Sequence, residues 1–205
     1  MRVEIKICGC TNADDVNAAI DNGADYIGFV IYPGSPRCIS PVMVTKILGK
    51  VGRKVKAVGV FVNERREFVE RITGDCGLFA VQLHGNENPD DFAGMQVPVW
   101  RAVWMKGAEY EPLPSKWHVE RYVLDATVPG KYGGTGNTAD WSKIGDFVKA
   151  CPVMLAGGLS PSNVESAIRL LRPLGVDVVS GIEAVPGRKD HAKMKSFFDA
   201  VKKAG

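Results

Sequence analysis

The sequence predicts an α/β fold, with residues 1–205 forming one domain, a (β/α)8 TIM barrel. The first observation is that short Val- and Ile-rich runs alternate with amphipathic stretches along the chain. The second is that eight such runs fit in 205 residues, or roughly one βα unit per 25 residues, near the lower limit for a closed barrel. The third is that no linker, low-complexity segment or charge block divides the chain.

An open doubly wound sheet is the alternative α/β architecture. At this length such a sheet typically has about five or six strands and a glycine-rich fingerprint after the first of them. Here the first apolar run is followed by Cys8-Gly9-Cys10-Thr11-Asn12, which does not match that fingerprint. We therefore favour the closed barrel.

The individual elements follow from local patterning. Strands are expected at Val3–Cys8, Asp25–Ile31, Val55–Val62, Leu78–His84, Val97–Val103, Val119–Asp125, Pro152–Ala156 and Val176–Ser180. Helices are expected at Ala13–Asn22, Pro41–Leu48, Glu64–Thr73, Pro89–Gly94, Asp140–Ala150, Pro161–Arg172 and Lys189–Lys203. Asn12 and Ser160 are the predicted N-caps of two of them, and Pro161 would occupy a first helical position. The segment Lys106–Lys116 has the weakest helical pattern.

Composition and charge narrow the functional class. The chain is 45% hydrophobic, and 26 Lys and Arg against 23 Asp and Glu give a net charge of +3. A disordered chain would contain fewer apolar residues. The charge is too small to indicate nucleic acid but suits a small anionic substrate. The longest uncharged apolar stretch, Tyr26–Pro36, is too short to span a membrane, and the N-terminus lacks a signal-peptide core.

Five cysteines, an odd number, argue against a disulfide framework and favour a reducing compartment, with the cytoplasm expected. Cys8-Gly9-Cys10 is not a CxxC motif, and no His, Asp or Glu spacing suggests a metal site. From these spacings we expect no metal. The sequence leaves a monomer and a homodimer equally open.

In a barrel of this kind, functional residues lie where strands end and βα loops begin. Alternation along the first strand places Lys6 and Cys8 on one face, toward the barrel interior. An ammonium group beside a thiol would depress the pKa of the thiol and favour the thiolate. The alternative is an inert buried cysteine beside a lysine that pairs with Glu4.

Other strand ends carry further candidates. Asp125 ends an apolar run, where half-burial would raise its pKa and suit a general acid, although a turn cap is an equal alternative. Arg37 lies in a Pro-containing loop and could clamp a carboxylate, or simply be solvated. Gln82 and His84 share an inward strand face, where a satisfied core histidine is the plainer interpretation.

Two glycine-containing loops suggest a phosphate site. Gly157-Gly158 and Ser180-Gly181 follow the last two expected strands, and a short helix near Ile182 would add its positive end. Phosphate sites after the seventh and eighth strands recur in this fold. A pair of tight turns is the alternative.

Nine short fragments follow one another along the chain. They are Lys6–Gly9, Gly28–Val30 with Ser35–Arg37, Val58–Asn63, Val81–Gly85, Leu124–Asp125, Gly133–Gly136 with Asp140–Trp141, Ala156–Leu159, Val176–Glu183 and Pro186–Asp190. In this order and at these spacings they together resemble the phosphoribosylanthranilate isomerase family of tryptophan biosynthesis. The resemblance weakens over Val99–Lys116 and at Cys38, Ile39 and Val179.

The resemblance implies a cofactor-independent Amadori rearrangement, catalysed by an intramolecular aldose–ketose isomerase. N-(5-phosphoribosyl)anthranilate would become 1-(2-carboxyphenylamino)-1-deoxyribulose 5-phosphate. Asp125 would be the general acid at the ring oxygen, and Cys8 the general base at C2. Arg37 would clamp the anthranilate carboxylate. The remaining implied substrate contacts are Asp177 and His84 with Gln82 in the sugar region, and Gly157, Gly158, Ser180 and Gly181 at the phosphate.

Four alternatives stay open at this stage. A sugar-phosphate isomerase of histidine biosynthesis shares the fold and chemistry but has Asp where this chain has Cys8. A dual-specificity enzyme is disfavoured for the same reason. A barrel that only binds a phosphorylated ligand would leave two opposed proton-transfer groups unexplained, and a scaffold would leave the polar rim unexplained.

Overall fold

The computed structural model describes residues 2–52, 55–106, 109–125 and 144–205. Within these ranges a closed barrel of eight parallel strands confirms the predicted fold, because each strand pairs with the next and the last pairs with the first. The strands are β1 (Glu4–Cys8), β2 (Tyr26–Val30), β3 (Lys56–Phe61), β4 (Ala80–Leu83), β5 (Val99–Lys106), β7 (Arg121–Asp125), β8 (Val153–Ala156) and β9 (Gly175–Val178).

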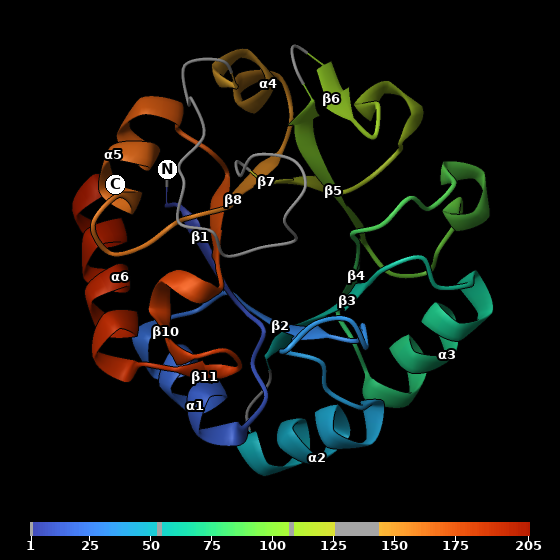
Figure 1. The fold of residues 1–205 in the computed structure, drawn as a ribbon, viewed down its shortest axis with the longest axis horizontal. Helices are drawn as coiled ribbons and strands as arrows, with labels where there is room; N and C mark the ends of the chain where they lie inside the picture. The colour runs from blue at the N-terminus through green and yellow to red at the C-terminus, as the bar shows by residue number, and fades with distance from the viewer. Residues whose placement is uncertain (1, 53–54, 107–108, 126–143) are drawn as a thin grey trace.

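Helices surround the barrel (Figure 1). They are α1 (Ala13–Asn22), α2 (Pro41–Val51), α3 (Arg66–Cys76), α4 (Gly145–Ala150), α5 (Val164–Leu171) and α6 (His191–Ala204). After β4 the chain forms only a 3-10 turn, η1 (Pro89–Phe92). No helix of the described ranges has the length and apolar character needed to cross a membrane.

The described part of the segment with the weakest helical pattern contains no α-helix. There a short strand, β6 (Glu109–Glu111), pairs antiparallel with the end of β5, and a 3-10 turn, η2 (Pro114–Lys116), follows. Two prolines within a few residues prevent a regular helix here, because each lacks a backbone donor.

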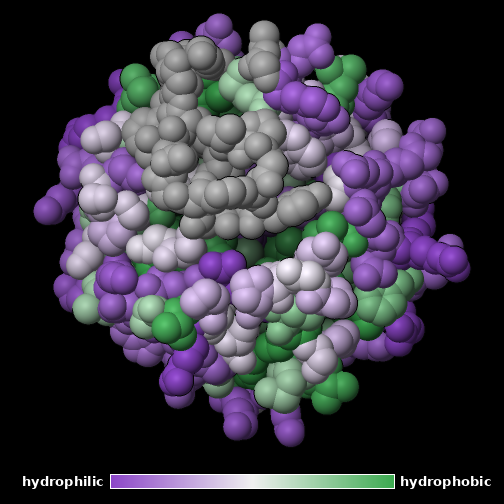
Figure 2. All heavy atoms as spheres, viewed as in Figure 1, coloured by the Kyte–Doolittle hydropathy of each residue, from purple (hydrophilic) through white to green (hydrophobic). Residues whose placement is uncertain are grey.

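Strand alternation divides the core into two parts. One face of each strand packs outward on the helices, as Ile5 and Ile7 of β1 do. The inward faces fill the barrel with Tyr26, Val58, Ala80, Trp100, Val123, Met154 and Ala156. Hydrophilic residues dominate the outline of the molecule in Figure 2, and hydrophobic residues show near the centre of the view.

Three described helices start later than predicted, and the one expected from Glu64 begins at Arg66. The helix expected from Pro161 begins at Val164, because the Asn163 side chain accepts from the Ser160 amide (2.8 Å) and donates to the Gly158 carbonyl (2.9 Å), which folds residues 158–163 into a loop. The helix expected from Lys189 begins at His191, capped by Asp190.

Residues between β9 and α6 also differ from expectation. Lys189 belongs instead to a hairpin of β10 (Glu183–Val185) and β11 (Arg188–Lys189). The short helix expected near Ile182 is one 3-10 turn, η4 (Ser180–Ile182). Three residues are too few to build a helix dipole, so this turn does not provide the positive helix end that the sequence predicted for a phosphate.

Candidate active site

One cavity opens where the carboxyl ends of the strands converge. Nine of the ten predicted site residues line it, namely Cys8, Arg37, Gln82, His84, Asp125, Gly157, Gly158, Asp177 and Ser180. Its walls also include apolar side chains such as Val30, Val60 and Val123. Gly181 is not among the lining residues. A Cβ there would lie 1.9 Å from the Leu159 carbonyl oxygen, so this glycine permits two loops to pack.

Cys8 ends β1 on the barrel interior, above Lys6. The Lys6 ammonium is fully buried and pairs with Asp177 of β9 at 2.7 Å, in register across the β1–β9 ladder. The predicted inward direction of Lys6 and Cys8 is therefore correct. Glu4 pairs with Arg121 instead, so the alternative Lys6–Glu4 pair does not form.

The predicted depression of the thiol pKa is wrong. Burial raises the pKa of Cys8, and this outweighs the lowering by the nearby Lys6 ammonium. The free energy needed to remove the thiolate from water exceeds the electrostatic stabilisation that the neighbouring ammonium gives it. Burial also lowers the pKa of Lys6, but Asp177 and Cys8 together raise it above its ordinary value. At neutral pH a neutral thiol therefore lies beside a charged lysine.

His84 and Gln82 lie together on the inner face at the end of β4. The Gln82 amide nitrogen is 3.1 Å from His84 Nδ1; with that amide donating, Nδ1 accepts and Nε2 carries the ring proton. Burial lowers the pKa of His84, although nearby Asp125 raises it. At neutral pH the ring is therefore an uncharged group in the cavity wall rather than a sealed core histidine.

Two buried acceptors in this wall are unsatisfied. Gln82 Oε1 and Asp177 Oδ1 make no hydrogen bond within the described residues. An unpaired buried acceptor costs roughly 1–3 kcal/mol. Both residues line the cavity, so a bound molecule with hydroxyl donors could satisfy these oxygens.

Asp125 is the last residue of β7, half-buried, and its strand neighbours are Trp104 and Ala156. It lines the same cavity as Cys8, from a strand separated from β1 by β8 and β9. The turn that Asp125 might cap, and the predicted Gly133–Gly136 motif, lie outside the described residues. The cavity therefore has a carboxyl and a thiol that approach it from different strands.

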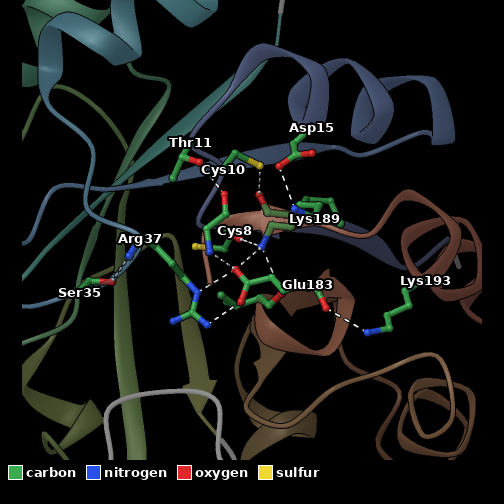
Figure 3. A network of polar contacts seen from close by, with 12 residues as sticks. Cys8, Cys10, Thr11, Asp15, Ser35, Arg37, Glu183, Lys189 and Lys193 are labelled. Carbon is green, nitrogen blue, oxygen red and sulfur yellow. Dashed lines mark hydrogen bonds and ion pairs between the residues drawn. The ribbon is translucent and has the colours of Figure 1, made fainter. Parts of the chain in front are cut away.

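Arg37 also lines the cavity, but its guanidinium is not simply solvated. Its Nε and Nη2 donate to the two carboxylate oxygens of Glu183, at 2.9 and 2.6 Å (Figure 3). The glycine loops complete the rim. Gly157 and Gly158 have φ of +84° and +66°, left-handed values that favour glycine, so this turn depends on both.

Among the described residues no group of three or more His, Cys, Asp or Glu side chains is arranged to hold a metal ion.

Comparison with known proteins identifies the family. Residues 5–200 match the family model described as N-(5'-phosphoribosyl)anthranilate (PRA) isomerase. A relative of that name from Magnetococcus marinus is 43% identical over 205 residues, which cover 100% of this chain and 97% of the relative. The chain belongs to the N-(5'-phosphoribosyl)anthranilate isomerase family.

Solved structures of this isomerase family share the fold. Phosphoribosyl anthranilate isomerase from Thermotoga maritima superposes with a TM-score of 0.87 and 38% identity, covering 98% of this chain and 99% of that chain. A second structure holds reduced 1-(o-carboxyphenylamino)-1-deoxyribulose 5-phosphate; its TM-score is 0.82, its identity 37%, and the coverage is 98% of this chain and 99% of that one.

Sequence reasoning missed three residues that shape this isomerase site. Glu183 and Lys189 lie within the matching fragments, but the sequence alone indicates no role for either. A Cβ on Gly28 would lie 2.6 Å from Cys8 Sγ and 3.0 Å from Lys6 Nζ, so this glycine makes room for both groups. The cross-strand register of Cys8 and Gly28 on β1 and β2 could have revealed that contact.

Proposed function

We propose that this chain converts N-(5'-phosphoribosyl)anthranilate into 1-(2-carboxyphenylamino)-1-deoxyribulose 5-phosphate, with Asp125 as general acid and Cys8 as general base. The reaction is an Amadori rearrangement, an intramolecular aldose–ketose isomerisation of tryptophan biosynthesis. Family membership supports the activity. The observation that supports the residue roles is that one cavity is lined by both proton-transfer groups.

The chemistry needs one proton delivered and one removed. The Asp125 carboxyl gives a proton to the furanose ring oxygen, and the ring opens to a Schiff base. The fraction of Cys8 that has lost its thiol proton to solvent acts as the base: this thiolate removes the proton from C2, which yields an enolamine that tautomerises to the ketone. Lys6, whose ammonium is fixed by Asp177 at 2.7 Å, stabilises the thiolate when it forms.

Binding is divided among the other lining residues. Arg37 meets the anthranilate carboxylate. Gly157, Gly158 and Ser180 hold the phosphate through backbone amides and a hydroxyl, while Gly181 lets the Ser180 loop pack on Leu159. The unsatisfied oxygens of Gln82 and Asp177 accept from sugar hydroxyls, with neutral His84 beside them.

We propose that the protein is located in the cytoplasm and that its oligomeric state is a monomer or a homodimer. All five cysteines are free, which suits a reducing compartment. Sedimentation of the purified chain distinguishes the two assemblies.

The experiment that tests this function follows the loss of anthranilate fluorescence when the purified chain meets phosphoribosylanthranilate. Asp125→Asn keeps the shape of the side chain but has no dissociable proton, so turnover should fall about a hundredfold or more while the Kd of the reduced product analogue changes little. A turn cap predicts the reverse, because Asn caps about as well as Asp. Near-normal kcat with an unchanged melting temperature would overturn the acid assignment.

A parallel assay with the aminoaldose phosphate of histidine biosynthesis addresses the nearest alternative. We expect no turnover, because that chemistry uses an Asp where this chain has Cys8. Measurable turnover would extend the proposed function to two substrates.

A further inference from the structure

A buried carboxylate lies between two cations at the edge of the cavity (Figure 3). Glu183 Oε1 accepts from Arg37 Nε at 2.9 Å, from the Gly187 amide at 3.1 Å and from Lys189 Nζ at 3.2 Å. Glu183 Oε2 accepts from Arg37 Nη2 at 2.6 Å. The Arg37 side chain is 13% exposed, Glu183 5% and Lys189 0%. Every member is thus held in an environment with little water.

This cluster fixes the orientation of the Arg37 guanidinium. A bidentate pair restrains the plane of the fork as well as its position. The stem is also confined, because a Cβ on Gly9 would lie 2.8 Å from Arg37 Cδ. Nη1 makes no hydrogen bond with the rest of the described chain, so it remains available to a molecule in the cavity that Arg37 lines.

The cluster also keeps a positive charge. Burial alone would raise the pKa of Glu183, but the hydrogen bonds from Arg37 and the charge of Lys189 lower it overall. Two cations and one ionised carboxylate leave a net charge of +1. Arg37 paired with Glu183 alone would be neutral, and Lys189 restores the attraction for an anion.

Lys189 connects this cluster to the end of β1. Its Nζ donates to the Cys8 carbonyl at 2.6 Å and to the Val179 carbonyl at 3.1 Å. The carboxylate site and the backbone of the thiol residue therefore share one buried ammonium.

We propose that Glu183, assisted by Lys189, is a positioning residue that holds the Arg37 guanidinium in the orientation required to recognise the substrate carboxylate. This inference rests on the proposed function, which assigns that carboxylate to Arg37. Glu183 itself repels a carboxylate and acts only through Arg37.

The test is a double-mutant cycle of Arg37→Ala and Glu183→Gln. Each variant is characterised by its carboxylate preference, which is the Kd of a product analogue without the carboxyl group divided by the Kd of the reduced product analogue. Glu183→Gln replaces one acceptor oxygen with an NH2 group that cannot accept from Arg37, so the bidentate pair is lost and the preference should fall about tenfold or more. In the Arg37→Ala background the same substitution should cause no further fall.

A purely electrostatic role and a positioning role for Glu183 predict opposite changes of the carboxylate preference in Glu183→Gln. Removing the carboxylate raises the cluster charge to +2, so electrostatic attraction alone would strengthen the preference. A strengthened or unchanged preference, or an equal fall in both backgrounds, overturns the inference. If Glu183→Gln does not fold, Glu183→Asp replaces it: the charge stays, the reach shortens, and an unchanged preference again overturns the inference.

Glu87→Gln is the matched control for general damage. Glu87 forms a buried ion pair with an arginine, Arg101, at 2.8 Å, and does not line the cavity. Its loss should leave the carboxylate preference unmoved. Wild-type protein without isomerase turnover would refute the proposed function, whereas wild-type turnover with an unmoved preference in Glu183→Gln refutes only this inference.

Discussion

The pair Lys6–Asp177 and the pair Arg101–Glu87 are alike in charge, burial and distance, at 2.7 and 2.8 Å. They differ in how fully the carboxylate is satisfied. Glu87 uses both oxygens: Oε1 accepts from the amides of Asn63 and Gly85, and Oε2 accepts from Gly85 and Arg101. Asp177 uses only Oδ2, and its Oδ1 has no partner among the described residues.

This difference separates structure from function. A fully bonded buried carboxylate fixes the loops around it, here those after β3 and β4, and has nothing left for a ligand. A buried carboxylate with a free oxygen in a cavity wall has a cost of about 1–3 kcal/mol that a ligand can remove. Ion pairing alone therefore does not mark an active site, but incomplete satisfaction beside a cavity does.

The largest expected effect is at the reactive end of β1. Cys8→Ala removes the base, so kcat should fall by about 10²–10⁴-fold, which corresponds to roughly 3–5 kcal/mol. The Kd of the reduced product analogue should change little, because the thiol moves a proton and contributes little affinity. Discontinuous assays at high enzyme concentration measure the residual kcat of the variant.

Cys10→Ala is the matched control for Cys8→Ala. Cys10 is also buried, two residues along the chain, but burial raises its pKa to about 12 and its thiol contacts the Ile7 carbonyl rather than the cavity. Its replacement should leave most of the turnover. A Cys8→Ala enzyme with more than about a hundredth of the wild-type rate would contradict the base assignment.

The sequence was enough to predict the barrel, its strands and most of the rim, because strand alternation and strand ends are local features. Lys6 and Cys8 pointing inward followed from period two alone. The sign of the Cys8 pKa shift did not follow, since it depends on how deeply β2 and β9 bury the thiol. The Arg37–Glu183 pair could not be predicted either, because 146 residues separate its members. The start of α5 depended on the Asn163 side-chain contacts.

The second largest expected effect concerns the Arg101–Glu87 pair and the stability of the fold. Glu87→Gln breaks a buried pair whose carboxylate is fully hydrogen-bonded and removes the charged partner of Arg101, which should cost about 3 kcal/mol. For a chain of this size that lowers the melting temperature by roughly 6–12 °C. Calorimetry measures the shift.

Asp177→Asn should instead lower kcat at a temperature where both variants remain folded. Loss of kcat in Glu87→Gln under the same conditions would contradict the distinction between a structural pair and an active-site pair.

The third effect is the pH dependence of the reactive end. Because burial raises the pKa of Cys8 above its ordinary value of 9.0, the thiolate fraction below that pKa falls about tenfold for each unit of decreasing pH, or 1.4 kcal/mol per unit. The value of kcat/KM should therefore rise with pH and still be rising at about pH 8. The Kd of the reduced product analogue over the same range is the control. A plateau of kcat/KM from pH 7 upward would mean that Lys6 prevails over burial.

The smallest expected effect concerns a solvent-exposed ion pair, which serves as the reference for the two buried pairs. Lys195 and Asp199 form an i,i+4 pair on α6 at 3.1 Å, with 69% and 49% of their side chains exposed. Water screens such a pair, and a cation N-terminal to its anion is the weaker orientation on a helix. Asp199→Asn should therefore change the free energy of unfolding by no more than about 0.5 kcal/mol, or roughly 1–2 °C in melting temperature. Neither kcat nor KM should change, because α6 presents this pair to solvent. A loss comparable to that of Glu87→Gln would show that burial is not what distinguishes these ion pairs, and the comparison between them would then need another physical basis.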